Sequence, residues 1–370
     1  MAPWGIWWNA GFHGGLWDWR MLFDRHDRVP AKIDHLRYFN AASTKQWQTI
    51  NIRMENPKDT QTNTIVEIAP DGDLILIVGP EEAKLHVHSM WLRAVSKPFS
   101  AMFRPDWKEG RDLLDCDRPA ELLLPEDNAA ALKIICCIIH HQNRKVPQPL
   151  AAGDVLAVAV AADKYDCVKA LRFASESWLR ASRDEAGDLM LLTAAAYLFQ
   201  NAQAFKEITK ALILDYDGPY LALSCRQVES AMPWKVFCLL EEQRGVARLG
   251  VADILIAGVN DGTGLCVHKC GWTSKYAYAY MKLLESEHLW PAHLPHVSIS
   301  KALQSAETMP DPIPEESSTS CTYGYKHDAP AYRRNRALSL DLFDKSIGLC
   351  LHCVRSGSVY SNCSQRSHSC

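Results

Sequence analysis

Two short strand-forming segments joined by a turn constrain the fold of this chain more than any other feature. Residues 73–78 form an apolar run rich in β-branched side chains, which is typical of a strand covered on both faces. Residues 84–88 alternate in polarity, so Leu85 and Val87 are expected to point inward. Residues 79–82 supply the turn, because a glycine is followed there by a proline. The pattern predicts a β-hairpin.

Helical patterns follow the hairpin directly. Ser89 is predicted to cap one helix over residues 89–103, with an apolar face. A third strand is predicted at 121–124, where polarity alternates before a proline. The next helix, at 129–141, is rich in isoleucine on all sides and is therefore expected to be central and buried.

Helices also account for most of the remaining patterns. They are expected at 155–164, 167–179, 189–199, 204–214, 252–259 and 275–289. Changes in composition then divide the chain into four parts. These are a mostly disordered segment (1–62), a compact domain (63–180), a helical extension (181–260) and a cysteine- and histidine-rich region that is partly disordered (261–370).

Four stretches within residues 66–179 form a distinctive series. They are Asp71-Gly72-Asp73-Leu74-x-Leu76-x-Val78-Gly79, Leu85-x-Val87-His88-Ser89-x-x-Leu92-x-x-x-Ser96-x-x-Phe99-x-x-x-Phe103, Leu124-Pro125-Glu126-Asp127 and Val155-x-x-Val158-x-x-x-Ala162-Asp163-x-Tyr165. In this order they resemble the successive elements of BTB/POZ domains. Together with Trp107-Lys108-Glu109-Gly110, these sequences are particularly similar to those of BTB proteins of filamentous fungi.

The resemblance implies an α+β fold, in which a small, mainly antiparallel sheet is flanked by a cluster of helices. A mostly helical extension and the cysteine- and histidine-rich tail would follow it. The resemblance also implies a protein–protein interaction adaptor rather than an enzyme. Such adaptors self-associate or recruit a partner, in some relatives a cullin-type ubiquitin ligase. Well-known dimeric members begin with an N-terminal helix, whereas residues 34–62 show weak helical periodicity, so homodimerisation stays open.

Four residues are candidates for partner contact under this resemblance: Asp73, His88, Phe99 and Phe103. Asp73 has two readings, a satisfied structural carboxylate or part of a charged pocket that receives partners. His88, at the start of the first core helix, is expected to make a local hydrogen bond, and partner contact is the alternative.

Cysteine and histidine are concentrated near the C-terminus. Seven of the thirteen cysteines lie there: Cys266, Cys270, Cys321, Cys350, Cys353, Cys363 and Cys370. A structural zinc site needs four nitrogen or sulfur ligands, and two often come from a Cys-x-x-Cys turn, the spacing of Cys350 and Cys353. Cys270 and Cys321 are the candidates to complete it. Structural zinc, reduced thiols and a disulfide all remain open for this region.

Two further pairs have ligand spacing on one helix. Cys136/His140 and Cys137/His141 are both separated by four residues, which places each pair on one face. The two pairs point in different directions from an apolar helix, and unoxidised cysteine is among the most buried residue types. Core packing is therefore expected for both cysteines.

Charge and hydropathy bear on the possible partners and location of the protein. The net charge of −3 carries no global attraction for nucleic acid or anionic membrane. No run approaches the length of a membrane span, and no secretory signal pattern is present, so an intracellular protein of nucleus or cytoplasm is expected. The alternative function is a transcriptional regulator whose zinc-organised tail contacts nucleic acid through Arg333, Arg334 and Arg336.

Overall fold

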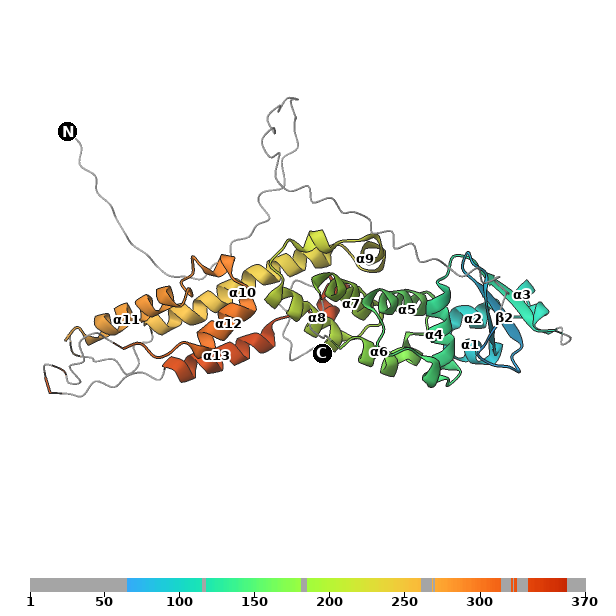
Figure 1. Ribbon diagram of the computed structural model, residues 1–370, viewed down its shortest axis with the longest axis horizontal. Coiled ribbons are helices and arrows are strands. Elements are labelled where there is room, and N and C mark those ends of the chain that lie inside the picture. The colour runs from blue at the N-terminus through green and yellow to red at the C-terminus, as the bar shows by residue number, and fades with distance from the viewer. Residues whose placement is uncertain are drawn as a thin grey trace, which may run out of the picture. The chain divides into compact units, whose positions relative to one another are not determined.

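The protein is described by a computed structural model (Figure 1). It describes residues 65–114, 118–180, 185–260, 268, 270–313, 321, 323–324 and 332–357. These residues belong to one compact unit that spans Gln61–Cys370. The segment 1–62, predicted to be mostly disordered, lies outside the described residues.

A four-stranded sheet forms one end of this unit. Its strands, in the spatial order β1-β3-β2-β4, are β1 (Val66–Glu67), β2 (Leu74–Val78), β3 (Ala83–Val87) and β4 (Ala120–Leu124). The predicted hairpin is confirmed, since β2 and β3 pair antiparallel and both Leu85 and Val87 are buried. The expectation of a mainly antiparallel sheet is wrong, because β1–β3 and β2–β4 are parallel. The helices between β3 and β4 form a crossover that lets β4 run in the same direction as β2.

The single helix predicted at 89–103 is two helices, α1 (Ser89–Val95) and α2 (Lys97–Met102). His88, not Ser89, is the N-cap of α1. Ser96 separates the helices in an extended conformation, and its hydroxyl accepts a hydrogen bond from the amide of Phe99. Pro98 explains the break, because proline fits the first turn of a helix but disrupts an interior. The predicted apolar face is nevertheless buried.

The isoleucine-rich helix is central, as predicted. It is α4 (Ala129–Ile139), which follows the short α3 (Lys108–Asp112) and β4. The side chain of Asn128 caps α4 by accepting a hydrogen bond from the amide of Ala131. The predicted helix 155–164 is α5 (Ala152–Lys164), whereas 167–179 is a 3-10 turn, η3 (Val168–Leu171), followed by α6 (Arg172–Trp178).

Helices make up nearly all of the remaining described chain. They are α7 (Ala186–Leu198), α8 (Ala202–Asp215), α9 (Arg226–Ala231), α10 (Lys235–Asn260), α11 (Trp272–Ser286), α12 (Ile299–Thr308), α13 (Tyr332–Ser346) and α14 (Leu351–Ser356), with short 3-10 turns η2 (Asn143–Lys145), η4 (Tyr220–Leu223) and η5 (Leu294–His296). The segment 252–259, predicted as a separate helix, is the end of the long α10. The fold is thus mixed α/β, with a small sheet and a mostly helical remainder.

One apolar core runs through the described elements. It includes the sheet, α4 and α5, and continues through α7, α8 and α10 to buried residues of α12 and α14. Helix α5 packs on α7, α7 on α8, and α8 on α10. Helix α10 also contacts α11, α12 and α13, so the C-terminal helices are assembled around it.

Two glycines set how closely α10 meets its neighbours. A Cβ added to Gly250 would lie 2.4 Å from the ring of Phe343 in α13. A Cβ added to Gly258 would lie 2.6 Å from the hydroxyl of Tyr280 in α11. Both aromatic side chains therefore occupy space that only a glycine leaves open.

Candidate functional site

Asp73 is a hydrogen-bonded structural carboxylate, which was one of the two interpretations of this residue. It directly precedes β2, and its carboxylate accepts hydrogen bonds from the amide of Ser89 at 2.7 Å and from its hydroxyl at 2.6 Å. The carboxylate thus satisfies an amide at the start of α1, where a negative charge is also favoured by the helix dipole. Asp73 itself is exposed, so it lines no buried pocket.

His88 joins the start of α1 to the end of α4. Its Nε2 lies 3.2 Å from Oδ1 of Asp71, and its backbone N–H donates to Nε2 of His140 at 3.0 Å. Nδ1 of His140 lies 2.8 Å from the carbonyl of Cys136. Since Nε2 accepts, the proton of His140 must reside on Nδ1, which donates to that carbonyl. Burial lowers the pKa of His140, so the neutral form that makes both bonds is favoured.

Phe99 and Phe103 are core residues. Both rings are buried, and that of Phe99 stacks on Tyr165 with 4.4 Å between ring centroids. The hydroxyl of Tyr165 donates to Asp127, which also pairs with Lys164 at 2.7 Å. Burial, with Asp127 beside it, raises the pKa of Tyr165. These two phenylalanines therefore hold the helices together in the core. Neither ring is exposed, so neither is available for the predicted contact with a partner.

The cysteines of α4 pack in the core, as expected. Cys136 and Cys137 are buried, and burial is the main cause that raises the pKa of each thiol. A raised pKa keeps a thiol protonated, which disfavours both reaction and metal binding. Their spacing to His140 and His141 thus reflects packing.

The four zinc candidates lie in the C-terminal part. Cys350 precedes α14 and Cys353 lies within it, and both are buried. Cys321 is buried and Cys270 is half-buried. Across the part of the chain that the structure describes, no three histidine, cysteine, aspartate or glutamate side chains are grouped to hold a metal ion. Cys363 and Cys370 lie outside that part. Structural zinc stays a prediction.

The arginines of α13 do not form one cluster. Arg333 and Arg334 are exposed, but Arg336 is only 5% exposed. Its Nε donates to the carbonyl of Ala306 at 2.7 Å and its Nη2 to that of Met309. These carbonyls belong to the C-terminal end of α12, which Arg336 therefore caps. Nucleic acid contact by all three arginines is not compatible with this arrangement.

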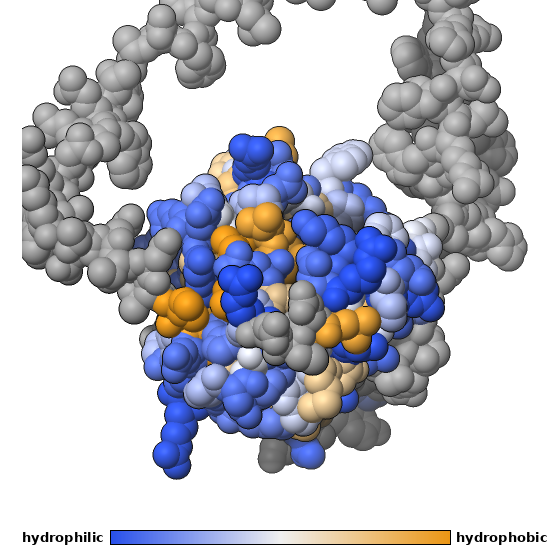
Figure 2. Space-filling model, turned by 90° about the vertical axis from the view of Figure 1, so that its right-hand side faces the viewer, coloured by the Kyte–Doolittle hydropathy of each residue, from blue (hydrophilic) through white to orange (hydrophobic). Residues whose placement is uncertain are grey.

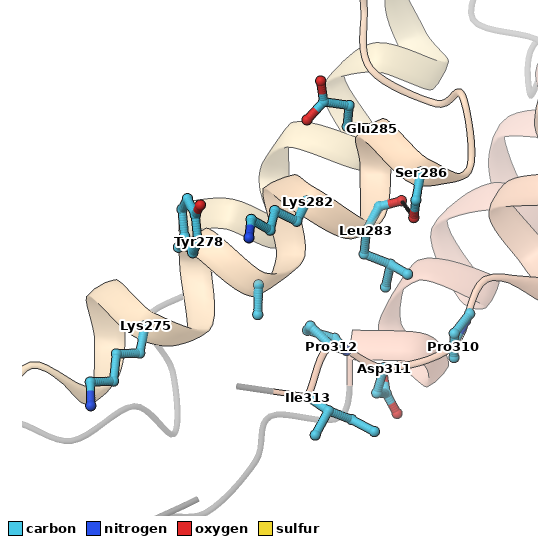
Figure 3. Close-up of a pocket in the computed structure, with 11 residues that line it drawn as sticks. Lys275, Tyr278, Lys282, Leu283, Glu285, Ser286, Pro310, Asp311, Pro312 and Ile313 are labelled. Carbon is cyan, nitrogen blue, oxygen red and sulfur yellow. Dashed lines mark hydrogen bonds between the residues drawn. The ribbon is translucent and has the colours of Figure 1, made fainter. Parts of the chain in front are cut away.

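A hollow of about 880 Å³ lies beside α11 (Figure 3). Figure 3 shows side chains of α11 on one side and residues 310–313 on the other. The ammonium group of Lys282 lies 4.7 Å from the centre of the Tyr278 ring. Among its described lining residues there is neither histidine nor cysteine, and Asp311 accepts a hydrogen bond from the amide of Arg333. The hollow thus offers a surface of mixed polarity.

Large apolar side chains lie exposed near the edge strand β4. Trp107 precedes α3 and is 60% exposed, Leu114 follows α3 at 67%, and Leu123 of β4 is also 67% exposed. Helix α3 contacts β4, which brings these positions to one region, termed here the α3–β4 surface. Figure 2 faces this end and shows apolar areas among hydrophilic ones. The strict alternation of β4 could have identified Leu123 as outward-facing from sequence.

No protein-family model matches the chain, and no curated protein matches it. Within the described residues, no helix is both long and apolar enough to cross a membrane.

Proposed function

We propose that this protein is a protein–protein interaction adaptor that acts through residues 63–180, which resemble a BTB/POZ domain. The α3–β4 surface carries the proposal. Trp107, Leu114 and Leu123 are each more than half exposed and are not part of the buried apolar core. Exposed apolar side chains grouped in one region mark a contact site for another protein, because burying them on association is favourable.

The element order supports the BTB/POZ assignment. A hairpin, the short helices α1, α2 and α3, a strand and a buried helix follow one another, and α5 and α6 come next. The quoted motifs imply this order with a single helix in place of α1 and α2. The mixed sheet is the feature that departs from the expectation of mainly antiparallel pairing. The partner under this proposal is a second copy of this chain or a different protein such as a cullin.

The experiment compares the full chain with a variant in which the α3–β4 surface is charged. Leu123→Glu should abolish self-association, measured by light scattering, or retention of a specific partner, measured by affinity purification. It should leave stability within about 0.5 kcal/mol, because the side chain is already in solvent. Leu221→Glu is the matched control, since Leu221 in η4 is 70% exposed and lies outside residues 63–180. A chain that stays monomeric and retains no partner, or an unaffected Leu123→Glu variant, contradicts the proposal.

The transcriptional regulator remains the alternative and predicts a different result. Retention on DNA or RNA that falls steeply with salt would favour it, because phosphate contacts release counterions. Loss of that retention in an Arg333→Ala, Arg334→Ala double variant would locate the contact on α13.

A further inference from the structure

A second exposed apolar face lies far along the chain from the α3–β4 surface, on α10 and α13. On α10 it follows the positions Glu242, Val246, Leu249, Asp253 and Ile256, all of which are exposed. These positions are separated by four, three, four and three residues. This 3.5-residue period places them in one stripe along the helix, as in the seam of a coiled coil. Such a seam normally faces another helix, yet no described residue covers it.

Helix α13 continues the same face. Leu338 and Leu342 are 58% and 70% exposed and are four residues apart, so they form a second apolar stripe. Leu249 of α10 is 67% exposed. The other exposed residues of α13 are polar or charged: Asn335, Ser339 and Ser346 lie beside the leucines, and Arg333, Arg334, Asp341 and Lys345 are exposed as well.

The contacts show that the two stripes lie on one side. Phe343 meets α10 at Gly250, whereas Arg336 reaches Tyr280, which meets α10 at Gly258. Going forward along α10 therefore means going backward along α13, so the helices are antiparallel, as Figure 1 also shows. In an antiparallel pair, the residue preceding each contact residue turns toward the same side, by about 100° in each helix. Leu249 and Leu342 precede Gly250 and Phe343, and thus share one face.

Two carboxylates give the α10 part of this face its chemical preference. Glu242 and Asp253 lie within the α10 stripe, and the described residues provide neither with an ion-pair partner. By contrast, the nearby Glu241 pairs with Arg244, and Asp341 pairs with Lys345. A ligand for this face must offer apolar side chains at helical spacing together with positive charge.

We propose that the α10–α13 face binds a basic amphipathic helix of a partner protein. The apolar stripe of that helix would pack between Leu249 and Leu342, and its lysine or arginine side chains would pair with Glu242 and Asp253. Complementary charge would fix the orientation and speed association, while burial of the leucines would supply most of the affinity. This site is separate from the proposed BTB/POZ function, and either can fail without the other.

The test uses the full chain and a defined probe. The probe is a fluorescent helical peptide with leucines at alternating three- and four-residue spacing and flanking lysines, and binding is measured by anisotropy. Leu342→Glu and Leu249→Glu should each weaken binding at least about tenfold, because each side chain is largely exposed before binding and buried after it. Phe173→Glu is the matched control, since Phe173 in α6 is 85% exposed and lies elsewhere.

A charge swap tests the chemistry separately. In Asp253→Lys, affinity should fall for the lysine peptide and rise for a peptide in which the lysines are replaced by glutamates. Equal binding of both peptides to the unmodified protein, no binding of the lysine peptide, or binding unchanged by Leu342→Glu overturns the proposal. Dimers that dissociate on Leu342→Glu also overturn it, because the face would then be occupied by a second copy of this chain.

Discussion

Arg336 provides the sharpest test of how the C-terminal helices are held together. Replacing it by methionine keeps the apolar stem of the side chain but removes the guanidinium group. The carbonyls of Ala306 and Met309 then lose their donors at the buried end of α12. A hydrogen bond from a charged group contributes about 1.5–3 kcal/mol, and an unpaired buried acceptor costs about 1–3 kcal/mol. Removing the buried charge itself returns part of this cost.

The expected net effect of Arg336→Met is a loss of about 3 kcal/mol in the free energy of unfolding, measured by urea titration. Arg336→Lys should cause a smaller loss of stability than Arg336→Met but should still be destabilising, because a single ammonium group cannot reproduce the forked geometry of the guanidinium. Arg333→Met is the matched control on the same helix. Its side chain is exposed, so its effect should stay within about 0.5 kcal/mol. If Arg336→Met were no more destabilising than Arg333→Met, the capping role would be refuted.

Three further outcomes are expected. The stability of the protein should decrease as pH falls below about 6.5, because the pKa of His140 is lowered in the folded state and the unfolded chain therefore takes up a proton first. In denaturant titrations across the same pH range, His140→Gln should lose less stability than the unmodified protein. Identical pH profiles of the two proteins would contradict this role of His140. Ser96→Ala should cost about 1 kcal/mol by removing the cap of α2, whereas Ser100→Ala within the same helix should cost clearly less in the same assay. Gly348→Ala should lower the melting temperature, since φ is +116° there and a Cβ would lie 2.6 Å from the carbonyl of Lys206; an unchanged melting temperature would refute the close approach.

The hairpin and α4 could be predicted from sequence because their patterns are local. Strand alternation placed Leu85 and Val87 inward, and an all-apolar helix has no face that suits water. The break at Ser96 was missed because the apolar face continues through it, although Pro98 carried the signal. The direction of β4 could not be predicted, since it depends on how the intervening helices cross the sheet.

The candidate sites depended still more on the folded arrangement. Sequence placed Phe99 and Phe103 on a helix face but could not say that this face was the buried one. Arg336 belonged to a basic cluster in sequence and is buried in the fold, because its guanidinium group bonds to the carbonyls of Ala306 and Met309 at the end of α12. The stripe on α10 could not be recognised as a binding face from sequence, since only its exposure in the fold distinguishes it from a core-facing stripe.

The glycines of α10 have a consequence for the order in which the chain becomes structured. Each glycine weakens an isolated helix by roughly 0.5–1 kcal/mol relative to alanine, so Gly250 and Gly258 leave α10 dependent on its neighbours. Phe343 and Tyr280, which occupy the space beside them, are encoded downstream. During synthesis, α10 is therefore made before the two side chains that pack against its glycines. A nascent chain arrested before α13 would expose the uncovered side of α10, where chaperones recognise unfinished proteins.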